Sequence, residues 1–168
     1  MRIKQLEELR KIHSEIKYSV ETDRENNENM ILKAMNKIIE LSSIARLEGL
    51  LALEDAVMDI PLCSEEQELK QFILLVIDGV EPDVILGIGL TRYYASLYTG
   101  YVALRYFIYL EGVLSIQAGE NPRILEEKIK AMLPSNLYFN YSIEQEKKQL
   151  EKEKKEKENL IEDLCKGK

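Results

Sequence analysis

Positive charge is in short supply in this sequence. Its 168 residues include 23 Lys and Arg against 30 Asp and Glu, which leaves a net charge of −7 and a pI near 5.0. Proteins that bind nucleic acid usually present a basic surface. We therefore expect no nucleic-acid partner for this chain.

Cysteine and histidine are also scarce. Cys63 and Cys165 lie far apart, and their separation matches neither a metal-binding spacing nor a disulfide framework. This usage fits a reduced, cytoplasmic setting. His13 is the single histidine, and it stands among Lys and Glu, so we expect it on the surface.

A long hydrophobic run is missing. Residues 84–110 are apolar apart from Arg92 and Arg105, and only 12 uncharged residues separate those arginines. A spanning helix needs about 18 or more apolar residues, and an arginine near its centre is costly. Six tyrosines make the segment amphipathic, and residues 1–8 lack the apolar core of a signal peptide. We expect a core helix here, no membrane insertion and a cytoplasmic location.

Signatures of catalysis are missing as well. Residues 87–89 (GIG) lack the third glycine and the preceding strand of a phosphate-binding loop. No serine or cysteine stands in a nucleophile motif. The acidic pairs Glu65–Glu66 and Asp55/Asp59 are of a kind common on helix surfaces, so we assign no metal and no cofactor. The sequence predicts that the chain is not an enzyme, and it offers no support for a ligand-binding bundle.

What the sequence does contain is helical periodicity. Apolar residues recur at steps of three and four, and no segment alternates with period two over a useful length. Glycine and proline mark the breaks, with proline near the start and glycine near the end of a helix. The pattern predicts an all-α protein, a compact antiparallel bundle of about five helices over residues 1–134. The helices are expected at about residues 1–21, 28–58, 64–77, 81–118 and 122–132.

The last part of the chain, residues 135–168, is dominated by Glu and Lys. Between Glu144 and Asn159 the only apolar residue is Leu150. Glu and Lys at helical spacing support a helix locally, but there is little apolar surface to pack. We expect a charged tail that is either an exposed helix or flexible.

A short sequence repeat links two of the expected helices. LEGLLALE at residues 47–54 resembles LEGVLSIQ at residues 110–117, at a constant offset of 63. One interpretation is that the two helices pack closely, each with its glycine, Gly49 or Gly112, where the other backbone passes. The other is chance, because Leu and Glu are common in helices. A glycine inside a helix costs about 1 kcal/mol, so Gly49 indicates either close packing or a bend in the expected 28–58 helix.

Three segments resemble the MotA family of flagellar motor stator proteins. They are ARLEGLLALE at residues 45–54, VIDGVEPD at 76–83, and EGVLSIQAGENP at 111–122 followed by LEEKI at 125–129. They occur in the family's order and cover about residues 31–134. The resemblance implies a helical body related to the cytoplasmic parts of a stator subunit.

The departures from the family limit what the resemblance implies. MotA proteins have two membrane helices before the first segment and two more between the second and third segments. Here residues 1–21 form a charged amphipathic pattern, and the later gap holds only the tyrosine-rich stretch. Ion conduction therefore does not carry over.

Contact with a protein partner is the property that the resemblance does imply. In the family, charges of the first segment face FliG, the switch protein of the rotor, and the matching positions here are Arg46 and Glu54. Eight residues separate them, so they are expected to share one helix face. An exposed pair of opposite charges suits the orientation of a partner. The alternative is an ordinary solvated helix face.

Tyrosines mark a second candidate surface. Tyr94, Tyr98, Tyr101 and Tyr109, together with Arg105, fall along one side of the expected 81–118 helix. Tyrosine suits interfaces, so one interpretation is a homo-oligomer contact. The other is a core helix whose hydroxyls reach water. The first would make the chain a self-associating scaffold or regulator unrelated to motility.

Overall fold

A computed structural model describes residues 3–18, 24–61, 64, 66–143, 145, 150, 154 and 155. These residues are largely helical and include no strand, which confirms the all-α prediction. The chain divides into two compact units, Met1–Met132 and Leu133–Lys168. The helices of the first unit are α1 (Ile3–Tyr18), α2 (Arg24–Glu48), α3 (Ala52–Met58), α4 (Gln67–Ile77), α5 (Pro82–Ser96), α6 (Gly100–Gln117) and α7 (Pro122–Met132).

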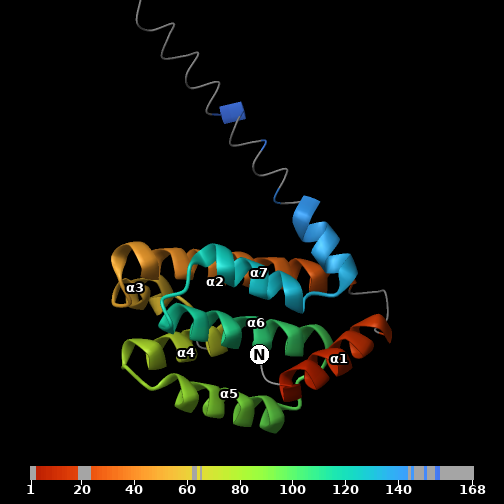
Figure 1. The fold of residues 1–168 in the computed structure, drawn as a ribbon, viewed down its shortest axis with the longest axis horizontal. Coiled ribbons are helices and arrows are strands. Elements are labelled where there is room, and N and C mark those ends of the chain that lie inside the picture. Colours follow the sequence, from red (N-terminus) through yellow and green to blue (C-terminus); the bar gives the residue numbers. More distant parts are fainter. Residues whose placement is uncertain are drawn as a thin grey trace, which may run out of the picture. The chain divides into compact units, whose positions relative to one another are not determined.

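Helix α6 lies at the centre of the first unit. It is buried on almost every side and packs against α1, α2, α4, α5 and α7 (Figure 1). A helix that is apolar all round is stable in water only when other elements cover it. These five helices therefore form the cover of α6.

The closest packing joins α6 to α2. A Cβ atom placed on Gly112 would lie 2.0 Å from Cγ1 of Ile38, so only glycine fits at this point. The prediction that the two helices pack closely is confirmed at Gly112, although a side chain of α2, and not its backbone, lies against this glycine. It is wrong at Gly49, which lies in an exposed turn with φ +93° and no atom within 4 Å of a Cβ atom placed there.

Two of the expected helices are each divided in two. The 28–58 segment breaks at Gly49 into α2 and α3, and the 81–118 segment breaks between Ser96 and Gly100 into α5 and α6. Leu97 has φ +53° and Gly100 has φ +54°, which are left-handed conformations. The first ends α5 and the second stands at the start of α6. The count of about five helices was therefore too low.

A side chain from α1 stabilises the second break. The N–H of Gly100 donates a hydrogen bond to the carboxylate of Glu15, at 2.9 Å. The first turn of a helix has N–H groups without partners and a partial positive charge, and a carboxylate satisfies both. Periodicity alone predicts one continuous helix here, because it takes no account of a contact between residues so far apart in the chain.

The turns before α5 and α7 follow the sequence signals closely. In each, a left-handed glycine ends one helix and a proline three residues later begins the next. In each, a backbone hydrogen bond of 3.0 Å closes the end of the preceding helix by joining residues five apart in the chain. The N–H of Val80 donates to the carbonyl of Leu75, and the N–H of Glu120 donates to the carbonyl of Ser115. Local chemistry is sufficient to specify both turns.

The second unit is described over a shorter stretch. Residues 135–143 form a helix, and Leu150 is exposed. Most of the expected charged tail, residues 135–168, lies outside the described residues. Within the described ranges, no helix has both the length and the apolar character needed to cross a membrane.

The contact between Gly112 and Ile38 gives a stability prediction. Gly112→Ala should destabilise the protein, because overpacking costs about 1–3 kcal/mol while the gain in helix propensity is about 1 kcal/mol. Ile38→Ala alone should cost about 2–5 kcal/mol. In the Ile38→Ala background the space is open, so adding Gly112→Ala should be neutral or stabilising. Urea unfolding of the four proteins measures this cycle, and an equal cost of Gly112→Ala in both backgrounds would contradict the contact.

Candidate protein-interaction site

The first MotA-like segment forms a corner between two helices. Helix α2 ends at Glu48, Gly49 takes a left-handed conformation, and α3 begins at Ala52. Backbone hydrogen bonds from Ala52 to Gly49 and from Leu53 to Leu50 close the turn at 3.3 and 3.1 Å. We call residues 46–58 the α2–α3 corner.

Large apolar side chains of the corner face water. The exposed fractions are 83% for Leu47, 75% for Leu51 and 62% for Met58. Helix α3 buries Leu53 and Val57 instead. Single exposed leucines are ordinary, but several at one corner make it a candidate contact surface.

Charged side chains flank these apolar residues. Leu51, Glu54, Asp55 and Met58 are spaced by three or four along the chain, which places them on the outer side of α3. Arg46 is exposed at the end of α2. Among the described residues, neither Arg46 nor Glu54 has an ion pair that would fix its side chain.

The predicted geometry of Arg46 and Glu54 was wrong, although both side chains are exposed as a contact role requires. They do not share one helix face, because Arg46 belongs to α2 and Glu54 to α3. The reason is the left-handed turn at Gly49, which ends α2 between them. The two charges therefore lie on either side of the exposed leucines in the chain.

The four tyrosines do not form one surface. Tyr101 and Tyr109 are buried on α6. Tyr94 is 56% exposed on α5, and Tyr98 is half-buried in the turn that follows, with its hydroxyl donating to Glu68. The break between α5 and α6 separates the tyrosines, so a contact surface in this fold includes only Tyr94 and Tyr98.

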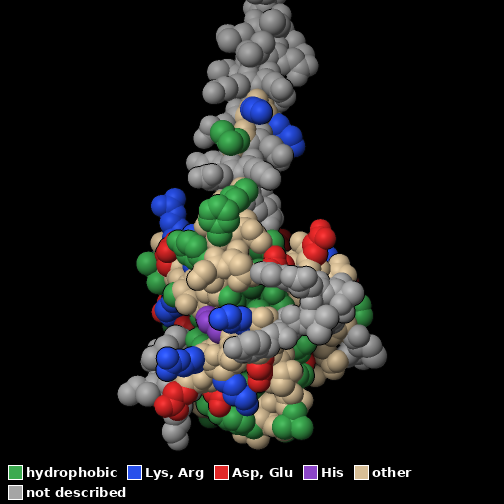
Figure 2. All heavy atoms as spheres, turned by 90° about the vertical axis from the view of Figure 1, so that its right-hand side faces the viewer, with side chains coloured by type: hydrophobic (Ala, Val, Ile, Leu, Met, Phe, Trp, Pro, Cys, Tyr) green, Lys and Arg blue, Asp and Glu red, His purple; other side chains and the backbone are tan. Residues whose placement is uncertain are grey.

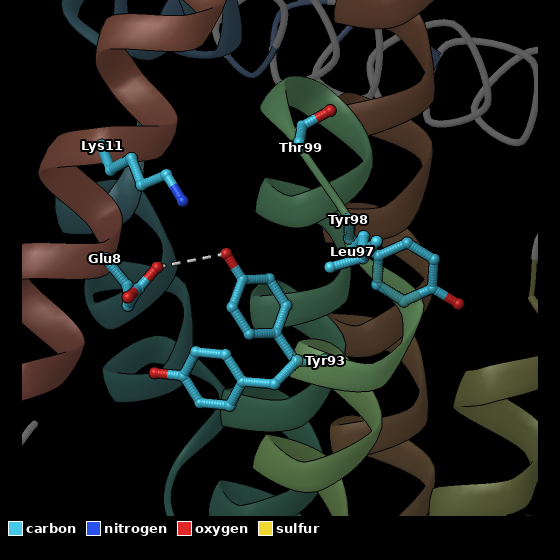
Figure 3. A pocket seen from close by; sticks show the side chains of 7 residues that line it. Glu8, Lys11, Tyr93, Leu97, Tyr98 and Thr99 are labelled. Carbon is cyan, nitrogen blue, oxygen red and sulfur yellow. Dashed lines mark hydrogen bonds between the residues drawn. The ribbon is translucent and has the colours of Figure 1, made fainter.

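Two hollows among the described residues of the first unit are small. One, of about 120 Å³, is shown in Figure 3 and is lined by residues of α1, of α5 and of the turn that follows α5. The other, of about 260 Å³, includes the mostly buried Arg105, with Lys33 and Glu66. Sites for small molecules usually occupy about 300–1,000 Å³. Both hollows are smaller than this range.

The single histidine has a structural contact. Figure 2 shows it at the surface, beside basic side chains. Its Nε2 atom donates a hydrogen bond of 2.8 Å to the carbonyl oxygen of Met132, which links α1 to the end of α7. Among the described residues, no three His, Cys, Asp or Glu side chains come together as a metal would need. Cys63, Cys165 and Glu65 lie outside the described residues.

No model of a known protein family matches this chain, and no curated protein sequence matches it. The resemblance of residues 45–54 to MotA proteins therefore stays a prediction from the sequence. The structure adds the exposure of the corner's apolar and charged side chains.

The Tyr93 hydroxyl gives a prediction of pH dependence. It donates to Glu8 at 3.3 Å (Figure 3), and burial, with the charge of Glu8 second, raises the pKa of Tyr93 from 10.0 to about 12. In the unfolded chain the hydroxyl loses its proton first, so the free energy of unfolding should fall as pH rises from 10 towards 12. Urea unfolding across that range measures the slope.

Two variants test the assignment to Tyr93. Tyr93→Phe should reduce the slope, because the residue no longer titrates. Glu8→Gln should lower the pKa of Tyr93, since the neighbouring negative charge is removed while burial remains. The tyrosinate absorbance band follows the ionisation directly. A slope in Tyr93→Phe identical to that of the wild type would show that Tyr93 contributes nothing.

Proposed function

We propose that this chain is a MotA-like helical protein that acts as a protein–protein interaction module in a flagellar motor-type assembly, without conducting ions. Its partner would be a rotor switch protein of the FliG type, bound at the α2–α3 corner. The observation that carries the proposal is the position of residues 45–54. The segment with the family's contact charges lies at an exposed corner and includes Leu47 and Leu51, which face water.

Physical chemistry supports a contact role for this corner. Leu47 and Leu51 contribute little to the core of the first unit, because most of each side chain is solvated. Apolar groups that become desolvated at the centre of an interface supply most of its binding energy. Arg46 on one side and Glu54 on the other would orient the partner and speed its association. We therefore expect binding that weakens with salt but does not vanish.

A second candidate is a self-associating scaffold or regulator without a motor role. The observation that favours it is the exposure of Tyr94 on α5, with Tyr98 next to it in the chain. The two candidates use different helices, because the corner belongs to α2 and α3. Binding to a rotor protein and self-association can therefore be measured separately.

Charge reversal at the corner tests the rotor contact. Arg46→Glu and Glu54→Lys should each weaken binding to purified FliG of the same organism by about tenfold, which corresponds to about 1.4 kcal/mol. Matched controls are Arg123→Glu and Glu127→Lys, which reverse the same charges at exposed positions of α7. Titration calorimetry at two salt concentrations measures the affinities.

Each result of that titration decides a different part of the proposal. Equal affinities for the wild type, the two corner variants and the two controls would exclude the charged corner as the contact. No binding by the folded wild-type protein would exclude FliG as the partner. Weakening by the corner variants alone would support both parts.

The exposed leucines give an independent test of the same corner. Leu51→Ser should leave the free energy of unfolding within about 0.5 kcal/mol of the wild type, as is usual for surface positions. It should weaken partner binding by about tenfold, because an apolar anchor is removed from the interface. Leu53→Ser is the contrasting variant, because Leu53 is fully buried and its replacement should destabilise the fold. Unchanged binding by Leu51→Ser would show that Leu51 is not an anchor.

A further inference from the structure

Helix α5 covers α6 with one side and exposes the other. Its buried residues are Ile85, Gly89 and Tyr93, four apart along the helix, and its packing is chiefly against α6. In Figure 1 it lies at the edge of the first unit. The opposite side faces water and consists of Val84, Gly87, Ile88, Thr91, Tyr94 and Ala95. We call these six residues the outer face of α5.

The outer face of α5 carries no charge. Asp83 precedes it, and the one cation within the helix, Arg92, is directed towards α4. The Arg92 guanidinium donates a hydrogen bond to Gln71 and lies 5.7 Å from the centre of the Phe72 ring. A surface helix normally has charged residues on its solvent side. In a chain with 32% charged residues, an uncharged outer face indicates a surface that is covered by another protein.

We propose that the outer face of α5 binds the same face of a second copy of this chain. Each copy carries a net charge of −7, so two copies repel each other over most of their surfaces. At the outer face of α5 they meet without apposing like charges. A surface that matches itself forms a closed dimer about a twofold axis.

The side chains favour an antiparallel arrangement of the two α5 helices. With the two outer faces, Val84 to Ala95, aligned at their midpoints, Val84 of one copy lies opposite Ala95 of the other, and Ile88 opposite Thr91. Val84 and Ile88 then each meet a smaller side chain, which allows ridges to pack into grooves. Antiparallel helices also align their dipoles favourably.

Charges at the rim complement each other in this arrangement. Asp83 stands at the N-terminal end of the outer face. At the other end of α5, Lys11 of α1 is exposed and lines a hollow together with Leu97 (Figure 3). Glu8 lines the same hollow, where it accepts a hydrogen bond from the Tyr93 hydroxyl. An antiparallel pair therefore brings Asp83 of each copy towards Lys11 of its partner, and a parallel pair does not.

The size of the face sets the expected affinity. A helix of 15 residues is about 22 Å long, and one helix side offers less than the roughly 800 Å² per partner of a standard interface. Tyr94 and Leu97, which is 82% exposed, supply the largest apolar groups. We expect a reversible dimer with a dissociation constant on the order of micromolar.

Charge placed at the centre of the face tests the dimer. Sedimentation velocity of the wild type across the micromolar range should show a shift from monomer to dimer. Thr91→Lys and Thr91→Glu should each be monomeric, because like charges meet near the twofold axis, while an equal mixture of the two should form dimers. The control is Met58→Lys, which introduces the same charge at an exposed apolar position of α3 and should dimerise like the wild type. Circular dichroism verifies that each variant is folded.

Disulfide trapping tests the antiparallel arrangement. In a background with Cys63→Ser and Cys165→Ser, a Val84→Cys chain mixed with an Ala95→Cys chain should form a covalent heterodimer. Neither chain alone should form one. Three results would each overturn the proposal. They are covalent homodimers from Val84→Cys alone, a wild type that remains monomeric, and full dimerisation by either Thr91 variant alone.

Discussion

The burial of α6 is the constraint on which the rest of the structure depends. An apolar helix of 18 residues in water requires cover on every side, and five other helices provide it. The cover is tight enough that the residue at position 112 must be glycine, because Ile38 occupies the space of a side chain. One polar group on α6 that is satisfied within the fold is the Tyr106 hydroxyl, which donates to the carbonyl of Gly89 at 2.8 Å. The peripheral helices are thus positioned by the central one.

Local chemistry explains which parts of the fold are predictable from sequence. The turns at Gly79 and Gly119 were predicted correctly, because a left-handed glycine followed by proline specifies them without help from distant residues. The break before Gly100 was missed, because its main contact is with Glu15 of α1, 85 residues away. A helical period also continues in register through Gly49, so periodicity could not show that α2 ends there.

The candidate site likewise has features that the local sequence predicts and others that depend on the fold. The resemblance to MotA selects Arg46 and Glu54 from the sequence, but not their arrangement. Leu47 and Leu51 match the apolar pattern of a core helix, and only the turn at Gly49 places them in water. The tyrosines show the opposite error, since Tyr101 and Tyr109 match an interface pattern and are buried. Exposure depends on where a helix ends, and that is the feature a single sequence predicts least well.

The two exposed surfaces follow from the way α6 is covered. A helix that covers an apolar neighbour normally has a charged outer side, as α7 has with Lys130 paired to Glu126 and Glu127 at 2.9 Å. Helix α5 covers α6 equally well but has apolar groups on both sides. In the described part of the first unit, α5 therefore resembles α6 in having apolar side chains on more than one side, but its own neighbours do not fully cover them. In the dimer that we propose, a second copy of the same helix supplies the missing layer, whereas the charged corner of α2 and α3 is suited to a partner of a different kind.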